Sequence, residues 1–586
     1  MLGRKVIAAA AGTIFLAASI APSSYAGPKG PAHINNRNGI RHVLLISIDG
    51  MHALDLLNCS KGISGVNGGL PYCPHLAALG KQAVDYVDAS TSKPSDSFPG
   101  LMAIVTGGSP RTVGAYYDVA YDRVLAPPKD TTGNGVLGGT CTPNQPNGTR
   151  TEYEEGIDFD QSLLNGGAPS GDGGLNSINP DFLPRDPYNN CAPVYPYNFV
   201  RTNTVFGVLH NAGGYAAWSD KHPAYVAVAG PGDGSNLDDF YGPEINSEVK
   251  NYIPQNPMPS DVPQCATSTL PDTVEDPTDD YTGSFQNIQC YDSLKVQAIL
   301  NEIDGKTHDG GARAPVPTVF GMNFQAVSIG QKLVYQYGTP PAPYTTTGGY
   351  TDSAGTPSGS LLQEIEFADN SIGLMEAELK KQGLLNSTLF VITAKHGQSP
   401  IDPNRLLRIP ADNMGKAPSD ILGSTYLPDS EINQIGPTED DVSLLWLKDS
   451  SQTANAVALL ESSSPVTDNI AGIGQIFSGP SLRLIFGTPG VPPNGDPRVP
   501  DIAVVTNVGV IYTGGKKKVA EHGGFAHDDT NVMLLVSNPG LSATTITSTV
   551  ETAQIAPTIV AAVGLDPESL QAVQKEGTQS LPGLSF

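Results

Sequence analysis

The sequence predicts an α/β fold in which a mostly parallel central sheet is sandwiched by helices. Short, unbroken apolar runs alternate along the chain with stretches of helical periodicity, and some runs end directly on polar residues. Residues 43–48 precede Asp49, and residues 389–394 precede Lys395 and His396. Uninterrupted apolar runs are typical of strands buried on both faces. Their alternation with helices indicates a parallel sheet covered by helices.

The elements of this core follow one another from residue 43 to residue 563. They are strand 43–48, helix 75–83, strand 85–88, a helix beginning at about residue 97, helix 204–211, strand 215–218, strand 318–323, helix 361–382, strand 389–394, strand 531–536 and helix 552–563. Apolar residues recur at three- and four-residue steps through 361–382, which is the pattern of a helix with one buried face.

Three segments interrupt this core. Residues 115–200 and 230–285 are loop-rich, and we interpret both as insertions. Residues 403–500 contain a predicted strand at 442–447 and a predicted helix at 453–461, so we expect a small α+β cap subdomain there. The catalytic core would then comprise residues 41–402 and 501–586. A chain of 586 residues is long enough for roughly two to four domains.

The composition argues against some partners. The net charge is −25, so a general affinity for nucleic acid or for an anionic membrane is not expected. Only 16% of the residues are charged, while there are 65 Gly and 50 Pro, which indicates long irregular loops around a compact core. The oligomeric state is left open.

The N-terminus has the pattern of a secretory signal peptide. Arg4 and Lys5 precede an apolar run at 6–20, and Ala26 ends a small-x-small cleavage site. We therefore expect a signal peptide at 1–26 and a linker at 27–40. The mature chain would be secreted or periplasmic, with no membrane span.

The 6 cysteines agree with export. An even number of cysteines in an exported chain favours disulfides, although the sequence leaves fifteen connectivities open. Sequential pairing is the arrangement that we expect. The pairs would be Cys59–Cys73, Cys141–Cys191 and Cys265–Cys290.

Polar residues at strand and helix ends form the candidate site. Asp49 would lie at the carboxyl end of its strand, where open α/β sheets bind ligands, although an Asp there can also cap a helix. Ser97 precedes an apolar helix, whose N-terminus favours a serine alkoxide or a bound phosphate; a plain N-cap is the alternative. With Lys395, His396 and His522 at two further strand ends, these residues form a metal-plus-nucleophile set.

This set resembles the signature of the alkaline phosphatase superfamily, and its order is similar to the type I phosphodiesterase and nucleotide pyrophosphatase branch. The motifs are Asp49, Ser97-Phe98-Pro99, His396-Gly397 and His522-Gly523, and residues 217–224 and 394–402 resemble a secreted microbial subgroup. The resemblance implies an alkaline phosphatase-like core and hydrolysis of a phosphoric ester through a phosphoserine at Ser97. It also implies that Asp49, Ser97 and His396 ligate divalent metal, and that His522 ligates a second metal or donates a hydrogen bond on the leaving-group side.

Several positions depart from the family pattern. Lys395 replaces the Asp that normally precedes His-Gly, and its cation would take over part of a metal's charge. The ligand pair of the other metal is incomplete. Asn323 and Gln325 supply only amides, and Asp352, which we keep as a candidate metal ligand, lies well downstream and is followed by Thr356 in place of a His. Gly100 stands where the phosphodiesterases carry an Asn. We therefore expect one metal in preference to two, with zinc first and manganese or calcium as alternatives.

Lys221, His222 and Gln325 are the candidate substrate-binding residues. Lys221 and His222 follow a predicted core strand and could bind a substrate phosphate, but pairing with the acidic surface is the alternative. The expected partner is a small phosphoester or nucleotide. A secreted phosphodiesterase or nucleotide pyrophosphatase is the first hypothesis and a phosphomonoesterase the second. The third is a catalytically inactive protein of the same fold that binds phosphate or another ligand.

Overall fold

A computed structural model describes residues 38–170, 173–249, 280–337, 344–412, 415–429, 437–463, 472–513 and 515–586. The predicted signal peptide and most of the predicted linker lie outside these residues, as does Cys265.

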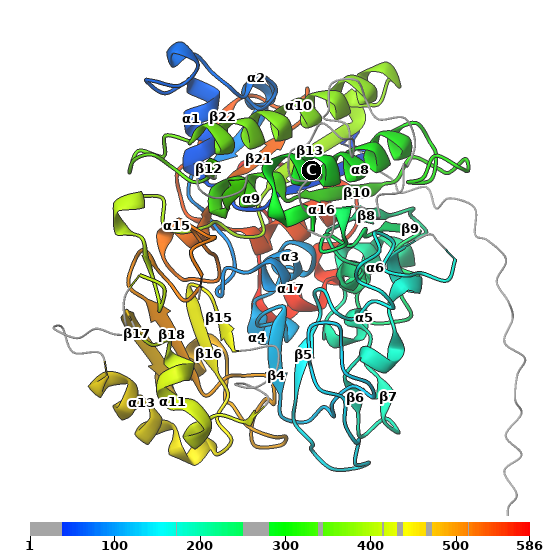
Figure 1. Ribbon diagram of the computed structural model, residues 1–586. Coiled ribbons are helices and arrows are strands. Elements are labelled where there is room, and N and C mark those ends of the chain that lie inside the picture. Colours follow the sequence, from blue (N-terminus) through cyan, green and yellow to red (C-terminus); the bar gives the residue numbers. More distant parts are fainter. Residues whose placement is uncertain are drawn as a thin grey trace, which may run out of the picture.

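An 8-stranded sheet forms the centre of the molecule, in the order β22-β2-β21-β13-β1-β10-β8-β9 (Figure 1). Its strands are β22 Thr544–Ile546, β2 Ala83–Tyr86, β21 Leu534–Ser537, β13 Thr388–Thr393, β1 His42–Ile48, β10 Val319–Phe324, β8 Ala217–Ser219 and β9 Asp239–Tyr241. Only β21 runs antiparallel to its neighbours, β13 and β2. The predicted mostly parallel sheet is therefore confirmed.

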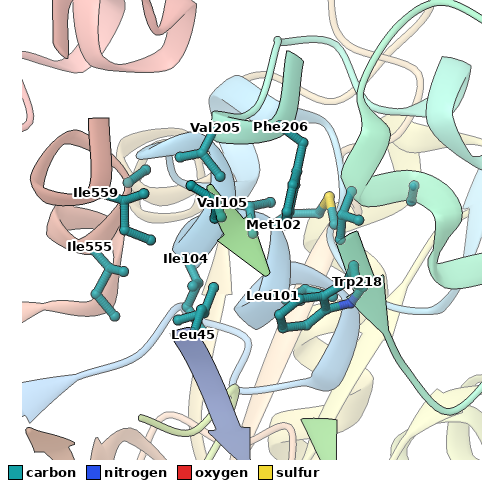
Figure 2. Packing of buried hydrophobic residues seen from close by; sticks show 14 of the residues in the cluster. Leu45, Leu101, Met102, Ile104, Val105, Val205, Phe206, Trp218, Ile555 and Ile559 are labelled. Atoms are coloured by element: carbon teal, nitrogen blue, oxygen red, sulfur yellow. The ribbon is translucent and has the colours of Figure 1, made fainter. Parts of the chain in front are cut away.

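β1 lies between β13 and β10 and is buried on both faces. Val43 and Leu45 belong to one hydrophobic cluster, while Leu44, Ile46 and Ile48 belong to another on the opposite face. Figure 2 shows Leu45 among side chains of the first cluster. Complete burial of such a side chain contributes about 1.5–3 kcal/mol, which explains why an unbroken apolar run forms the central strand.

Helices cover both faces of the sheet. The first cluster includes residues of α3 Ser97–Thr106, α6 Val205–Asn211 and α16 Ile555–Ala562. The second includes residues of α1 Ala53–Lys61, α2 Pro74–Leu79, α8 Phe285–Ile303, α9 Ala326–Lys332 and α10 Gly359–Lys381. The two sets lie on opposite sides of the sheet (Figure 1), so the predicted helix sandwich is also confirmed.

A second, smaller sheet lies at the lower left of Figure 1. Its strands are β15 Thr438–Glu439, β16 Val442–Leu445, β18 Ile502–Thr506 and β17 Ile473–Ser478, accompanied by α11 Pro418–Tyr426, α13 Thr453–Ser462 and α14 Gly479–Ile485. β18 lies beyond the predicted cap boundary at residue 500, because it pairs with β16 and β17 and not with the central sheet. The division of the chain into domains stays a prediction.

The predicted strand at 531–536 is two strands. β20 Asn531–Val532 pairs with β3 Ala89–Ser90, whereas β21 joins the central sheet. Between them, Met533 donates its backbone N–H to Met51 O over 3.1 Å. This contact with the segment after β1 separates the two strands, although their residues form one apolar run.

Residues 115–200 contain only short elements, among them β4 Val119–Asp122, β5 Thr149–Glu152, β6 Arg185–Asp186, β7 Ala192–Pro193 and α5 Pro196–Phe199. The remaining elements are α4 Pro110–Val113, β11 Val334–Tyr337, β12 Tyr344–Thr347, β14 Leu407–Arg408, β19 Val510–Ile511, α15 His527–Thr530, β23 Val550–Glu551 and α17 Gln571–Glu576. No helix among the described residues has the length and apolarity needed to cross a membrane.

Two of the predicted disulfides are present. Cys59 pairs with Cys73 between α1 and α2, and Cys141 pairs with Cys191 within the first predicted insertion. The third predicted pair includes Cys265, which lies outside the described residues.

Candidate active site

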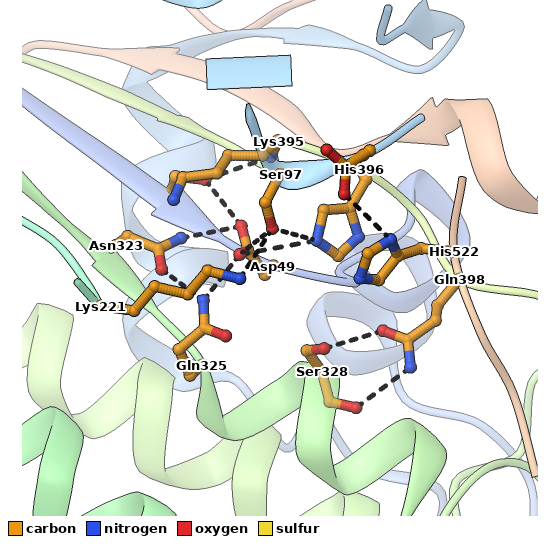
Figure 3. A network of polar contacts seen from close by, with 12 residues as sticks. Asp49, Ser97, Lys221, Asn323, Gln325, Ser328, Lys395, His396, Gln398 and His522 are labelled. Atoms are coloured by element: carbon orange, nitrogen blue, oxygen red, sulfur yellow. Dashed lines mark hydrogen bonds and ion pairs between the residues drawn. The ribbon is translucent and has the colours of Figure 1, made fainter. Parts of the chain in front are cut away.

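Neighbouring strands of the central sheet end at one place and deliver polar side chains there. Ser47 of β1 pairs with Asn323 of β10 and Thr393 of β13. Asp49, Gln325 and Lys395 each lie two residues beyond this level, so they emerge side by side. Figure 3 shows them together with Ser97 at the start of α3 and Lys221 after β8. The structure thus assembles residues that are far apart in the sequence.

The Asp49 carboxylate is fully buried and held by amides. Asn323 Nδ2 donates to Oδ1 over 2.8 Å, and Gln325 Nε2 donates to Oδ2 over 2.6 Å. Gly50, at φ +83°, turns the chain away after Asp49 in a conformation that favours glycine. Asn323 and Gln325, whose amides left the predicted ligand pair of the other metal incomplete, therefore orient Asp49.

Positive charge keeps Asp49 ionised. Burial by itself would raise the pKa of Asp49, but Lys395, His396 and Lys221 outweigh it and hold the pKa well below its usual range. The buried carboxylate therefore stays negative through the physiological range.

Ser97 Oγ lies between an imidazole and an ammonium group. It is 3.1 Å from His396 Nε2 and accepts a hydrogen bond from Lys221 Nζ over 3.1 Å. His396 Nδ1 is 2.8 Å from Gly397 O, which can only accept, so Nδ1 is the donor, and when the ring is neutral its lone pair is on Nε2, facing Ser97. The hydroxyl thus has a proton acceptor on one side and a cation that would stabilise its alkoxide on the other.

Ser97 is not the cap of its helix. The N-cap of α3 is Asp96, whose Oδ2 accepts a hydrogen bond from Phe98 N over 3.1 Å. The capping role is therefore filled by the preceding residue, and Ser97 Oγ is left to the site.

Lys221 is buried and protonated. Burial lowers its pKa, but the surrounding carboxylates of Glu154, Asp49, Asp118 and Asp96 outweigh this and raise the pKa above the ordinary lysine value. A fixed positive charge therefore contacts the Ser97 hydroxyl.

Lys395 adds a second buried ammonium but directs it elsewhere. Its Nζ donates to Asp220 Oδ1 over 2.7 Å and lies 4.2 Å from the centre of the Tyr225 ring. Burial lowers the pKa of Lys395, while Asp220 and Asp49 oppose that shift. The lysine that replaces a family Asp thus contributes charge to the site through space and does not contact Ser97 directly.

Gly100 is required by close packing. A Cβ atom at this position of α3 would lie 2.1 Å from Lys395 O. The backbone at the end of β13 therefore occupies the space that any larger residue would need. This contact accounts for glycine where the phosphodiesterases carry Asn.

His522 reaches the site from a loop, which corrects the prediction that it lies at a strand end. Ser399 and Glu521 exchange backbone hydrogen bonds of 2.8 and 2.9 Å, and this pairing brings the loop beside the segment that follows His396. The centres of the His396 and His522 rings are 4.0 Å apart. Burial, aided by His396 and nearby lysines, lowers the pKa of His522 well below its usual value.

The donor atoms fit one divalent metal better than two. Asp49 Oδ2, Ser97 Oγ and His396 Nε2 lie 3.1–3.5 Å from one another. Ligands bonded to one zinc at about 2.0–2.1 Å have similar separations. For a second metal, His522 offers an imidazole, but Asn323 and Gln325 face Asp49 as amide donors.

Asp352 lies apart from these residues. It is exposed and accepts hydrogen bonds from Ala354 N and Thr356 N in its own surface turn. This corrects the prediction that placed Asp352 among the metal ligands.

Sequence reasoning missed several acidic residues around the site. They are Asp118, Glu154, Glu155, Asp220 and Glu244. Only Asp220 carried a signal, because it directly precedes Lys221; the others lie in loops without a motif. One ligand atom from each of Glu154, Glu155 and His222 lies within 4.8 Å of the others, so this group could hold a metal ion.

A cavity of about 500 Å³ opens beside Lys221 and Gln325. Its wall includes Glu154 from the first predicted insertion and Asp440 next to the small sheet. Three parts of the chain therefore surround the space in which a ligand would meet the site.

One segment of the chain matches a known protein family. Residues 43–142, which include Asp49 and Ser97, match the family model of type I phosphodiesterase / nucleotide pyrophosphatase. Over this segment the chain is similar to the family. The match confirms the predicted branch of the alkaline phosphatase superfamily and identifies the chain as a hydrolase of phosphoester bonds. No curated protein matched the chain.

Solved structures of similar proteins include murine and human ectonucleotide pyrophosphatase / phosphodiesterase 5. The murine structure is 13% identical, covers 90% of this chain and 96% of its own, and has a TM-score of 0.48. The human structure is 12% identical, covers 93% of this chain and 97% of its own, and has a TM-score of 0.45. An inactive murine variant in complex with AMP is 13% identical, with the same coverage as the first murine structure and a TM-score of 0.47.

Proposed function

We propose that this chain is an exported phosphodiesterase of the nucleotide pyrophosphatase type in which Ser97 forms a phosphoserine. The observation that carries the proposal is the position of Ser97 Oγ, 3.1 Å from both His396 Nε2 and Lys221 Nζ. A serine hydroxyl attacks phosphorus only when its proton can leave and its alkoxide is stabilised. This arrangement supplies both conditions.

Asp49, Ser97 and His396 would hold one divalent metal, zinc first. When bound there, such a metal lowers the pKa of a coordinated hydroxyl and neutralises phosphoryl oxygens. Asn323 and Gln325 keep the Asp49 carboxylate in one orientation through their hydrogen bonds.

The lysines would complete the charge on the substrate side. Lys221 donates to the attacking oxygen and, as Ser97 bonds to phosphorus, can stabilise the negative oxygens of the phosphoryl group. Lys395, held by Asp220, keeps a further positive charge near Asp49. These cations support the expectation of one metal in preference to two.

Export is supported by the Cys59–Cys73 and Cys141–Cys191 disulfides, because such bonds persist mainly in oxidising compartments. The cavity of about 500 Å³ is in the size range of small-molecule sites and has room for a nucleotide or a diester. Because Asp49 is satisfied by amides, a phosphate-binding protein without turnover is the second candidate.

The test compares wild type, Ser97→Ala and a control, Ser92→Ala, whose hydroxyl donates to Pro94 O outside the site. Hydrolysis of bis-p-nitrophenyl phosphate and p-nitrophenyl phosphate is measured together with metal content. We expect diester turnover in wild type and control, its loss in Ser97→Ala, and about one equivalent of metal at this site. A wild type that binds phosphate but cleaves neither ester supports the binding role, and faster monoester cleavage supports a phosphomonoesterase.

A further inference from the structure

His222 is a buried imidazole with a fixed orientation. It is 2% exposed, and its Nδ1 lies 2.8 Å from Glu244 Oε1. The same oxygen accepts a hydrogen bond from Asn246 N over 3.0 Å, so it acts as an acceptor toward His222 as well. His222 Nδ1 is therefore the donor, and in a neutral ring the lone pair is on Nε2.

That lone pair faces a carboxylate. His222 Nε2 lies 3.4 Å from Glu155 Oε2. Glu154 offers a third ligand atom, and the three atoms lie within 4.8 Å of one another. A lone pair opposite two carboxylates is unfavourable unless a proton or a cation lies between them.

The neighbouring acids add to the negative charge. Asp118 is hydrogen-bonded to Glu154, and Glu154 to Glu155, so three carboxylates form a chain along the cavity wall. Carboxylates at this spacing cannot all ionise without a compensating cation. Lys221 supplies one positive charge, but its Nζ donates to Ser97.

We propose that Glu154, Glu155 and His222 bind a divalent cation in the cavity wall, at a site separate from Asp49, Ser97 and His396. The donors are two carboxylates and one imidazole, a set suited to manganese or zinc. The Glu244 carboxylate accepts a hydrogen bond from His222 Nδ1. Histidines that bind a metal through one ring nitrogen commonly donate the other ring N–H to a carboxylate in this way. Because Glu154 and Glu155 follow β5 while His222 follows β8, the cation ties the first predicted insertion to the central sheet.

The test is Mn²⁺ binding to the EDTA-treated full-length protein without substrate, followed by electron paramagnetic resonance. Wild type is compared with Glu155→Gln and with Glu439→Gln. The latter makes the same substitution in the same cavity wall, at a residue that bonds to Ser419 and Ser443. His396→Ala removes a ligand of the other candidate site.

We expect His396→Ala and Glu439→Gln to retain a bound Mn²⁺ with coupling to a histidine nitrogen. In the His396→Ala background, which lacks the other candidate site, Glu155→Gln should bind it at least about tenfold more weakly, and Glu244→Gln about 10–100-fold more weakly. Mn²⁺ should also raise the melting temperature of His396→Ala and not that of the double variant His396→Ala/Glu155→Gln, in which the other candidate site is removed as well. Glu154→Gln repeats the test if Glu155→Gln fails to fold by circular dichroism.

Wild-type affinity in the glutamate variants would overturn the proposal. So would the absence of bound Mn²⁺ in wild type, or its loss in His396→Ala alone. The inference is independent of the proposed function, because no substrate is present. Lost ester hydrolysis with intact Mn²⁺ binding in Ser97→Ala concerns the nucleophile only.

Discussion

Lys221 places a buried positive charge directly against the Ser97 hydroxyl. Its ammonium contacts the Ser97 hydroxyl and is kept protonated by the carboxylates around it. In related phosphodiesterases the resemblance implies that metal ions carry this charge. Under the proposed function a side chain would carry part of it here, because the residues at the place of one metal's ligand pair are amides that bind Asp49.

Lys221→Met should lower kcat for diester hydrolysis by about 10²–10³-fold, the usual effect of removing one donor from a developing negative charge. Lys221→Arg, which keeps the charge, should retain more activity. Steady-state kinetics of both variants checks this. Lys129→Met, at an exposed lysine paired with Asp181, is the control. Unchanged kcat in Lys221→Met would contradict a role at Ser97.

The sequence could single out the candidate catalytic residues because each follows an apolar strand or begins an apolar helix. Asp49, Ser97 and His396 were found in this way, and the strand register brings them together. Asp220, Glu154 and Glu244 could not be assigned, because their roles depend on loops from different segments meeting at His222 and Lys395. No periodicity marks such contacts.

Among the elements, α3 packs directly against the end of β13 at the site. Gly100 lets the helix approach until only a hydrogen fits against Lys395 O. This proximity places the first residue of α3 beside His396. His522 illustrates the opposite case, since an irregular segment is held there by backbone pairing with Ser399. Its position could not be predicted from a strand pattern.

Gly100→Ala should destabilise the protein by about 1–3 kcal/mol, because the added methyl group forces the helix and strand end apart. Activity should fall as well, since Ser97 begins the same helix. Gly80→Ala is the matched control: a Cβ there meets nothing within 4 Å and φ is −58°. Thermal unfolding of the two variants gives the comparison, and equal melting temperatures would refute the packing argument.

At the scale of the whole molecule, the chain buries acidic groups although its net charge is already −25. Burial raises the pKa of Glu152 to about 8 and that of Glu439 to about 7. The folded state therefore holds protons that the unfolded state has released. Their stabilising effect is complete below the ordinary glutamate pKa and is lost as the pH rises through these values.

In EDTA, the free energy of unfolding should therefore fall as the pH rises from about 6.5 to about 8.5, by up to about 1.4 kcal/mol per group for each pH unit. The melting temperature should fall with it. Below the ordinary histidine pKa the trend should weaken, because burial lowers the pKa of His222 and His522 and the unfolded state then gains protons. Calorimetry across this range checks the slope. Glu152→Gln should flatten it, and an unchanged slope would assign the effect to other groups.

The cavity is built from segments of different origin in the chain. Lys221 and Gln325 come from the central sheet, Glu154 from the first predicted insertion and Asp440 from the edge of the small sheet. Mutations, insertions or deletions in the outer segments can thus reshape the entrance while the central strands keep the residues around Ser97 in register. Selection for a new substrate can act on these outer segments alone. Descendants of one ancestral hydrolase can therefore diverge in substrate preference while they keep the same reaction mechanism.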